Sequence, residues 1–279
     1  MKEISFDFIV EKVKGLCKEA NYVLSEDMIK ALESAIKEED SILGKKVLSR
    51  LLENARIAKK ESIPICQDTG FAVFFVELGD KVKIKGGTLI DAINEGVRRG
   101  YREGYLRNSI CERFSRKNTG DNTPAIVHIE LVPGEKLRIV FTAKGGGSEN
   151  MSKALVLKPS DGKEGVKKFV VNQVREAGAN PCPPTIVGVG IGGTIEKAAI
   201  LAKKALLRKI GKPHPDKEIA QLEREILQEI NSLGIGPGGF GGKITSLAVH
   251  IETFPCHIAS LPVAVNLNCH ASRHREIIL

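Results

Sequence analysis

The sequence predicts an α+β protein, in which a helical N-terminal region is followed by antiparallel sheets packed with helices. Apolar residues recur at helical spacing through residues 5–60, and β-like runs begin after Pro64. Strands and helices then follow one another without regular βαβ alternation, which argues against a doubly wound sheet. We therefore expect one domain over residues 1–279, with a helical part at 1–62 and a mixed part at 63–279.

Two apolar stripes mark the N-terminal helices. Their members are Val10, Val13, Cys17 and Ala20 in the first stripe, and Leu43, Val47, Leu51, Ala55 and Ala58 in the second. Ser25 is a candidate N-cap between them. Because Cys17 lies on an apolar stripe, we expect it to be a buried core thiol.

The region after Pro64 predicts strands and further helices. Residues 71–76 form a β-like run, and Thr88 with Asp91 makes a capping pair for a helix that begins at Leu89. Two alternating segments, 125–132 and 136–143, flank a Pro-Gly-Glu turn and predict a β-hairpin. Further on, we expect helices at 163–178, 194–207 and 216–231, and strands at 185–189, 244–251 and 261–267.

Composition narrows the class of protein. No apolar run approaches the ~20 residues of a membrane-spanning helix, and the N-terminus lacks a signal-peptide pattern, so we expect a cytoplasmic protein without a membrane partner. Lys and Arg number 42 against 34 Asp and Glu, a net charge of +8 that suits a polyanion, a small acidic substrate or an acidic protein. Aromatic residues make up only 5%, so base-stacking platforms are scarce and no nucleic-acid partner is expected.

Three cysteines lie in loops with unusual neighbours: Cys66 in PICQDTG, Cys182 in NPCPPT and Cys269 in NLNCHA. In a reducing compartment, six cysteines favour metal binding or free thiols over disulfides. The separations of 116 and 87 residues exclude a local cluster motif, so the fold would have to assemble any shared metal. A cluster held by three thiolates leaves one iron open to act as a Lewis acid.

Eight compositionally unusual segments run across nearly the whole chain. They are PICQDTG (64–70), LRNS (106–109), RKNTGDNTPA (116–125), KGGGSEN (144–150), PCPP (181–184), GVGIGG (188–193), GFGGK (239–243) and NCHASRH (268–274). In type and order they resemble the class I fumarase and L-tartrate dehydratase family. The resemblance implies an Fe-S hydro-lyase domain of the α type.

The resemblance also implies an iron-sulfur cofactor with its cysteine ligands, and a catalytic role for one histidine. A [4Fe-4S] cluster would be held by Cys66, Cys182 and Cys269. Cys256, in a Pro-Cys-His loop, is the alternative to Cys269. His257 falls where the family has an active-site histidine, which implies a catalytic role.

Contacts to a small dicarboxylate substrate follow from the same resemblance. Arg107 would pair with a carboxylate in bidentate fashion, and Gln67 would orient a carboxylate or hydroxyl. Asp68 would take part in proton transfer beside the cluster. Gly146 and Gly147 would let backbone amides approach an anion.

The resemblance implies the α subunit of a two-subunit enzyme, because single-chain members carry a second domain and this chain stops at Leu279. We expect a separate β subunit, an α2β2 assembly and, as the first choice, fumarate hydratase of the tricarboxylic acid cycle, interconverting fumarate and (S)-malate. The alternative is the L-tartrate dehydratase α subunit, and mesaconate is a further possible substrate. An assembly subunit without its own chemistry is the non-enzyme alternative.

A glycine motif leaves one more function open. Gly188, Gly190 and Gly193 spell G-x-G-x-x-G, the dinucleotide fingerprint. The acidic residue expected about 20 positions later is missing, since residues 208–210 read Arg-Lys-Ile, and no βαβ unit closes. We favour a glycine turn near the cluster or an anionic group, with a dinucleotide-dependent oxidoreductase as the alternative.

Overall fold

The computed structural model describes residues 1–279, and the chain divides into two compact units. Unit 1 comprises Met1–Ser25, Asn54–Gly146 and Arg273–Leu279, and unit 2 comprises Glu26–Glu53 and Gly147–Ser272. The α+β class is confirmed, with sheets that are mixed rather than purely antiparallel. A single catalytic domain over 1–279 stays a prediction. None of the helices combines the length and the hydropathy that crossing a membrane requires.

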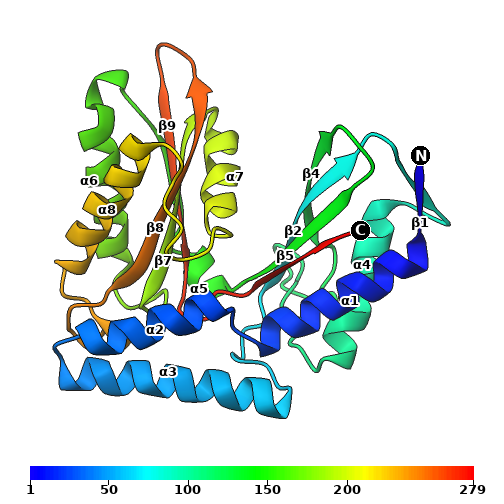
Figure 1. The fold of residues 1–279 in the computed structure, drawn as a ribbon, viewed down its shortest axis with the longest axis horizontal. Coiled ribbons are helices and arrows are strands. Elements are labelled where there is room, and N and C mark those ends of the chain that lie inside the picture. The colour runs from blue at the N-terminus through cyan, green and yellow to red at the C-terminus, as the bar shows by residue number, and fades with distance from the viewer. The chain divides into compact units, whose positions relative to one another are not determined.

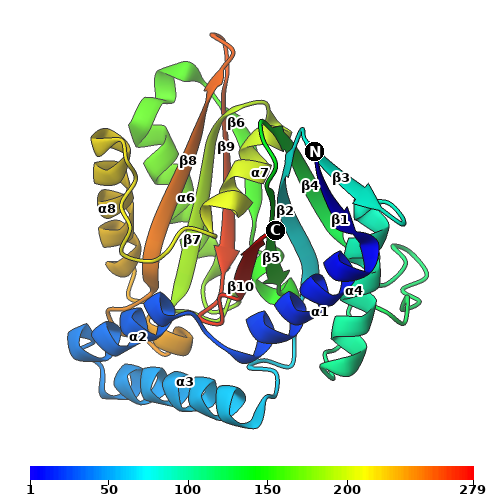
Figure 2. The ribbon, with the colours of Figure 1, turned by 45° about the vertical axis from the view of Figure 1, so that its right-hand side comes forward.

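Unit 1 packs helices against one mixed sheet (Figure 2). Its four-stranded sheet has the order β10-β5-β2-β4, and a separate parallel pair joins β1 to β3. The elements are β1 (Lys2–Ser5), α1 (Phe6–Tyr22), β2 (Phe71–Gly79), β3 (Val82–Lys85), α4 (Leu89–Glu103), β4 (Ile126–Val132), β5 (Leu137–Lys144) and β10 (His274–Ile278).

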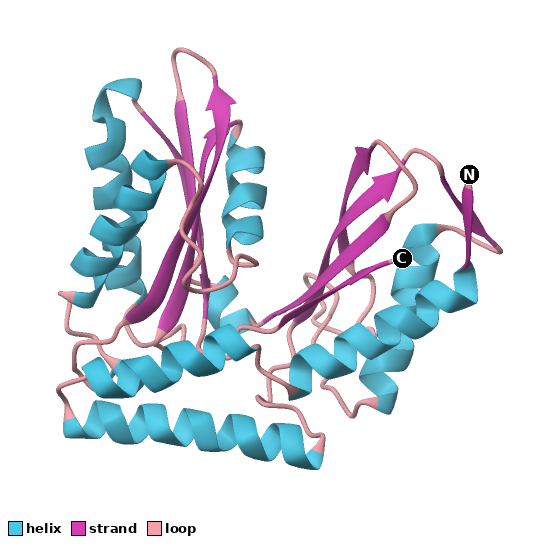
Figure 3. Cartoon of the chain, in the orientation of Figure 1, coloured by secondary structure: helices cyan, strands magenta, loops and turns pink.

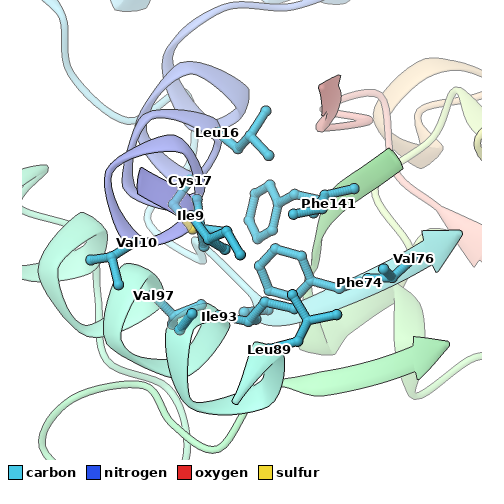
Figure 4. Close-up of a cluster of buried hydrophobic side chains, with 14 of the residues drawn as sticks. Ile9, Val10, Leu16, Cys17, Phe74, Val76, Leu89, Ile93, Val97 and Phe141 are labelled. Carbon is cyan, nitrogen blue, oxygen red and sulfur yellow. The ribbon is translucent and has the colours of Figure 1, made fainter. Parts of the chain in front are cut away.

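The core of unit 1 lies between its sheet and the helices α1 and α4 (Figure 4). The Phe74 and Phe141 rings meet there with their centroids 5.2 Å apart. Gly96 lets the two helices approach closely, because a Cβ at this position would lie 2.6 Å from the Val13 Cβ. Cys17 is fully buried in this core, as predicted, and burial raises the pKa of its thiol.

The predicted hairpin is wrong, although both of its strands form. Strand β2 lies between β4 and β5, pairing parallel with β4 and antiparallel with β5. The turn at 133–135 specifies only that the chain reverses, whereas burial decides which strand takes the centre of the sheet. Residues 72–76 of β2 are all buried, and a strand that is apolar on both faces is stabilised in a central position.

Unit 2 has three layers, with α6 and α8 on one face of its sheet and α7 on the other (Figure 1). The strand order is β6-β9-β7-β8; β7 is parallel to β8 and antiparallel to β9. The elements are α2 (Glu26–Glu38), the first part of α3 (Ile42–Glu61), most of α5 (Gly146–Glu149), β6 (Lys153–Leu157), α6 (Gly162–Ala177), β7 (Thr185–Gly193), α7 (Ile195–Ala205), α8 (Lys217–Asn231), β8 (Ser246–Cys256) and β9 (Leu261–Asn268).

The helices predicted after residue 160 match α6, α7 and α8 to within two residues at each end. The second N-terminal stripe is only partly correct, because Leu43 is 49% exposed, and α2 was not delimited. Thr88 caps α4 by accepting the Asp91 N–H at 3.1 Å, which confirms the capping pair. Ser25 precedes α2, but its hydroxyl makes no hydrogen bond. The strands absent from the sequence interpretation are β1, β3, β6 and β10, each only four or five residues long. Short strands at sheet edges carry little alternation by which to recognise them.

The glycine motif of β7 serves helix packing. A Cβ at Gly188 would lie 2.1 Å from the Ala202 carbonyl oxygen, and one at Gly190 would lie 2.0 Å from the Ala198 carbonyl oxygen. Both glycines lie inside the strand, so α7 can pack directly on its backbone. The favoured interpretation, a turn that faces an anionic group, is therefore wrong for these two glycines.

Gly190→Ala is expected to lower the free energy of unfolding by about 3 kcal/mol, because the added methyl group collides with helix backbone that cannot rotate away. Chemical denaturation measures this change. Gly15→Ala is the control: Gly15 lies exposed in α1 with nothing near its Cβ position, so alanine should raise stability by up to about 1 kcal/mol. Equal stabilities of the two variants would contradict the packing role.

Candidate active site

The first candidate loop, residues 62–70 of unit 1, is held in place by hydrogen bonds from a buried tyrosine. Tyr101, fully buried, donates its hydroxyl to the carbonyl oxygens of Thr69 at 2.8 Å and Gly70 at 3.1 Å. Burial raises the pKa of Tyr101 well above its ordinary value, so the phenol stays a neutral donor. Gly70 has φ +77°, and a Cβ there would meet the Lys144 backbone at 2.8 Å. Only glycine fits this position.

Asp68 is oriented by three contacts within unit 1. Its carboxylate accepts the Gly70 N–H at 3.0 Å through Oδ1 and the Gly146 N–H at 2.7 Å through Oδ2. Its carbonyl oxygen accepts a hydrogen bond from the guanidinium of Arg273, which is 2% exposed. A carboxylate held by backbone donors keeps one orientation, which is what proton transfer at a fixed substrate atom requires.

Thr69 links this loop to the segment that carries Arg107. Its hydroxyl accepts the Arg107 N–H at 2.9 Å and donates to the Arg107 carbonyl oxygen at 3.1 Å. The Arg107 side chain is exposed and forms no ion pair, so its guanidinium is available to an anion. In this unit the structure therefore brings the backbone of the Arg107 segment to the Asp68 loop.

Cys66 and Gln67 lie on the solvent side of the same loop. The Cys66 thiol is partly exposed, and its sulfur lies 3.5 Å from the Gln67 Oε1. Gln67 itself is exposed. Both side chains are therefore accessible to a ligand.

The second and third cysteine loops meet at one end of the unit 2 sheet. Cys182 comes just before β7 and Cys269 just after β9, and β7 pairs with β9 through Ile186 and Asn268. The Cys182 carbonyl oxygen lies 3.1 Å from the Nδ1 of His270. The structure thus brings these two loops together, as the predicted cluster requires.

The backbone at Cys182 is strained. Its φ is +55°, in the left-handed region that non-glycine residues rarely adopt. Such strain persists where the surrounding structure holds it, and it concentrates at functional sites. Its thiol is exposed.

Figure 3 shows the strands of the unit 2 sheet running side by side along its length. Cys256 is the last residue of β8 and His257 follows it, at the opposite end of this sheet from Cys182. The register pairs Thr185 with Ser246 and Gly193 with Cys256, so Cys256 is roughly 25 Å along the strands from the Cys182 end. His257 is exposed in the β8–β9 turn and accepts the Ala259 N–H through Nδ1. Within one chain, the structure therefore does not bring His257 or Cys256 to the Cys182 and Cys269 loops.

The predicted glycines lie at the join between β5 and α5. Gly146, in unit 1, donates its N–H to Asp68, so that amide is already occupied. Gly147, in unit 2, is exposed and begins the segment that leads to Glu149. Glu149 accepts hydrogen bonds from Lys203 at 2.6 Å and Asn266 at 3.0 Å, which ties the segment to α7 and β9.

Three contributing residues were not singled out from the sequence, namely Thr69, Tyr101 and Arg273. Thr69 and Arg273 fall inside the quoted motifs, so their position was a usable signal. Tyr101 lies in a helix outside them, and its role depends on a contact 32 residues away in sequence. In neither unit taken alone do three His, Cys, Asp or Glu side chains gather as metal ligands.

Comparison with known proteins identifies the family. A model described as fumarate hydratase (fumerase) matches residues 10–278. A protein of Methanocaldococcus jannaschii, provisionally named L(+)-tartrate dehydratase subunit alpha, is 46% identical over 271 residues, covering 95% of both chains. The L(+)-tartrate dehydratase subunit alpha of Escherichia coli (strain K12) is 35% identical over 260 residues, covering 92% of this chain and 86% of its own. The chain belongs to the fumarate hydratase family, a class of hydro-lyases.

Proposed function

We propose that this chain is the α subunit of an L-tartrate dehydratase, a hydro-lyase that acts with an iron-sulfur cluster. The relatives named above support L-tartrate as the substrate over fumarate, which was the first choice from the sequence. The observation that best supports a catalytic site is that the Cys182 and Cys269 loops lie next to each other in unit 2.

The proposed [4Fe-4S] cluster would be held by Cys66, Cys182 and Cys269. The donor set fits such a group, because all three thiols are at least partly exposed and none is in a disulfide. Register favours Cys269 over the alternative Cys256, which lies at the far end of the sheet. When bound, the cluster would supply a Lewis acid at an iron that no thiolate holds.

The residues of the chain would divide the remaining work. Loss of water from L-tartrate removes a proton from one carbon and a hydroxyl from its neighbour, and the resulting enol becomes a keto acid. Asp68 would accept the proton, since backbone donors hold its carboxylate in place. Arg107 would pair with a substrate carboxylate, and Gln67 would hydrogen-bond a substrate oxygen. The backbone of the exposed Gly147 would meet the same anion, whereas Gly146 would act by orienting Asp68.

A catalytic role for His257 would require a second copy of the chain. Because the strand register separates it from Cys182 and Cys269 in its own chain, His257 would have to act on a site that includes a second copy. We keep this role as a proposal under that condition.

A β subunit would complete the enzyme, since the similar proteins are named as alpha subunits. We propose an α2β2 assembly, by analogy with those names and with the family resemblance. The test is an anaerobic hydro-lyase assay of the reconstituted two-chain complex on L-tartrate, fumarate and mesaconate. Turnover of L-tartrate at least roughly tenfold above the other two, in kcat/KM, is expected, since a site built to pair with a second hydroxyl discriminates strongly against acids that lack it.

Fumarate hydration is the second candidate, supported by the description of the matching family model. A preference for fumarate in the same assay would select it. A complex that keeps full activity without iron, or a chain that is dispensable for activity, would reject both candidates and favour an assembly subunit.

A further inference from the structure

Unit 2 contains a buried carboxylate that has no part in the proposed catalysis but binds several backbone N–H groups. Glu39, directly after α2, is 0% exposed and forms no ion pair. Its carboxylate instead accepts four backbone N–H groups, those of Asp40, Ser41 and Lys243 at 2.9 Å and of Ile244 at 2.8 Å. Burial raises the pKa of this carboxyl, but the backbone donors outweigh it and leave the pKa below its ordinary value. Glu39 is therefore a buried anion at neutral pH.

The glycine loop, which we define as residues 234–243, is shaped around this carboxylate. Gly242 has φ +119°, and a Cβ there would lie 2.6 Å from the Glu39 Oε1. Gly236 has φ +69°, and a Cβ there would lie 2.0 Å from the Gly241 carbonyl oxygen. The loop closes on itself and on Glu39 at positions where no side chain fits.

The other side of the glycine loop holds the Cys182 loop. Gly238 donates its N–H to the Pro183 carbonyl oxygen at 2.8 Å. A Cβ at Gly239 would lie 2.3 Å from the Ala179 Cβ, so the two loops are in direct contact. Ala179 in turn accepts the Cys182 N–H at 3.0 Å. The strained backbone of Cys182 is thus held from both flanks by residues that touch the glycine loop.

We propose that Glu39 is a positioning residue for Cys182: by fixing the glycine loop, it holds the Cys182 thiol in the orientation that receives the cluster. The inference rests on the proposed function, in which Cys182 is a ligand. It assigns Glu39 no contact with substrate or metal. Its effect passes through backbone hydrogen bonds, so a neutral side chain of the same size does not replace it, because an amide nitrogen would face N–H donors.

The test compares Glu39→Gln with a matched control, Glu223→Gln. Glu223 is also buried in unit 2, at 6% exposure, and it accepts the Ile251 N–H at 2.7 Å, but it does not touch the glycine loop. Glu39→Gln should speed hydrogen exchange of segment 236–239 roughly tenfold or more. In the metal-free chain it should change the alkylation rate of Cys182, with the exposed Cys256 as an internal reference. In the reconstituted complex it should speed loss of iron and of visible absorbance to a chelator.

Glu223→Gln should lower stability without these three effects. Glu39→Asp keeps the charge on a shorter side chain, so its effects on hydrogen exchange, Cys182 alkylation and iron loss should be intermediate. This variant replaces Glu39→Gln in the test if Glu39→Gln does not fold. Unchanged exchange and iron loss in Glu39→Gln, or equal changes in Glu223→Gln, would overturn the inference. If wild type binds no cluster, the proposed function fails, while hydrogen exchange and Cys182 alkylation still decide whether Glu39 braces the loop.

Discussion

Replacing Cys182 or Cys269 with Ser is expected to remove the visible absorbance of the cluster and to lower hydro-lyase activity by at least roughly 10³-fold, the loss that follows when several kcal/mol of Lewis-acid stabilisation disappear. A serine hydroxyl is a poor iron ligand at neutral pH, whereas a cysteine thiolate is a strong one. Absorbance and activity of the anaerobically reconstituted two-chain complex measure the two effects together.

Cys256→Ser is the matched control for these substitutions. Its thiol is also exposed and in the same unit, but it lies at the other end of the sheet. We expect this variant to keep both cluster and activity. Loss of both in Cys256→Ser, with retention in Cys269→Ser, would show that the ligand assignment is wrong.

Asp68→Asn is expected to lower kcat by roughly 10²–10⁴-fold, the usual contribution of a positioned general acid or base. The amide cannot accept a proton at neutral pH, and its nitrogen would face either the Gly70 or the Gly146 N–H, so the orientation of the side chain would also be lost. Steady-state kinetics of the complex, with cluster content measured in parallel, separate loss of chemistry from loss of cofactor.

Asp80→Asn provides the comparison for that variant. Asp80 is an exposed carboxylate of unit 1 that also accepts a glycine N–H, that of Gly134, at 2.7 Å. This change should leave kcat within about twofold, because a surface substitution of this kind perturbs the fold little. An Asp68→Asn enzyme with normal kcat would assign proton transfer to another residue.

Local patterns predicted the helices of this protein well. The stripe that contains Cys17 and the capping pair at Thr88 are determined by neighbours within a few turns, and both are present in the structure. Strand pairing depends instead on segments far apart in sequence. The turn at 133–135 could not reveal that β2 would come to lie between β4 and β5.

For the candidate site too, local sequence identified some features, and others depended on tertiary structure. Motif composition singled out Cys66, Asp68, Cys182 and Cys269, because these residues sit in loops with unusual neighbours. Composition could not rank Cys269 above Cys256, since each is followed directly by a histidine. Strand register separates them, with Cys269 beside the Cys182 loop and Cys256 at the other end of β7.

By itself, the sequence determined the fold class and most of the helices, and it marked the cysteine loops as candidate sites, because each of these depends on residue type and short-range spacing. Only the tertiary structure decided which strand fills the centre of each sheet, why β7 needs its glycines, and how the buried Glu39 reaches the glycine loop. These features arise from contacts whose sequence separation runs from 8 residues, between Gly190 and Ala198, to 204 residues, between Glu39 and Lys243. Such contacts form only when burial of apolar surface brings the segments together.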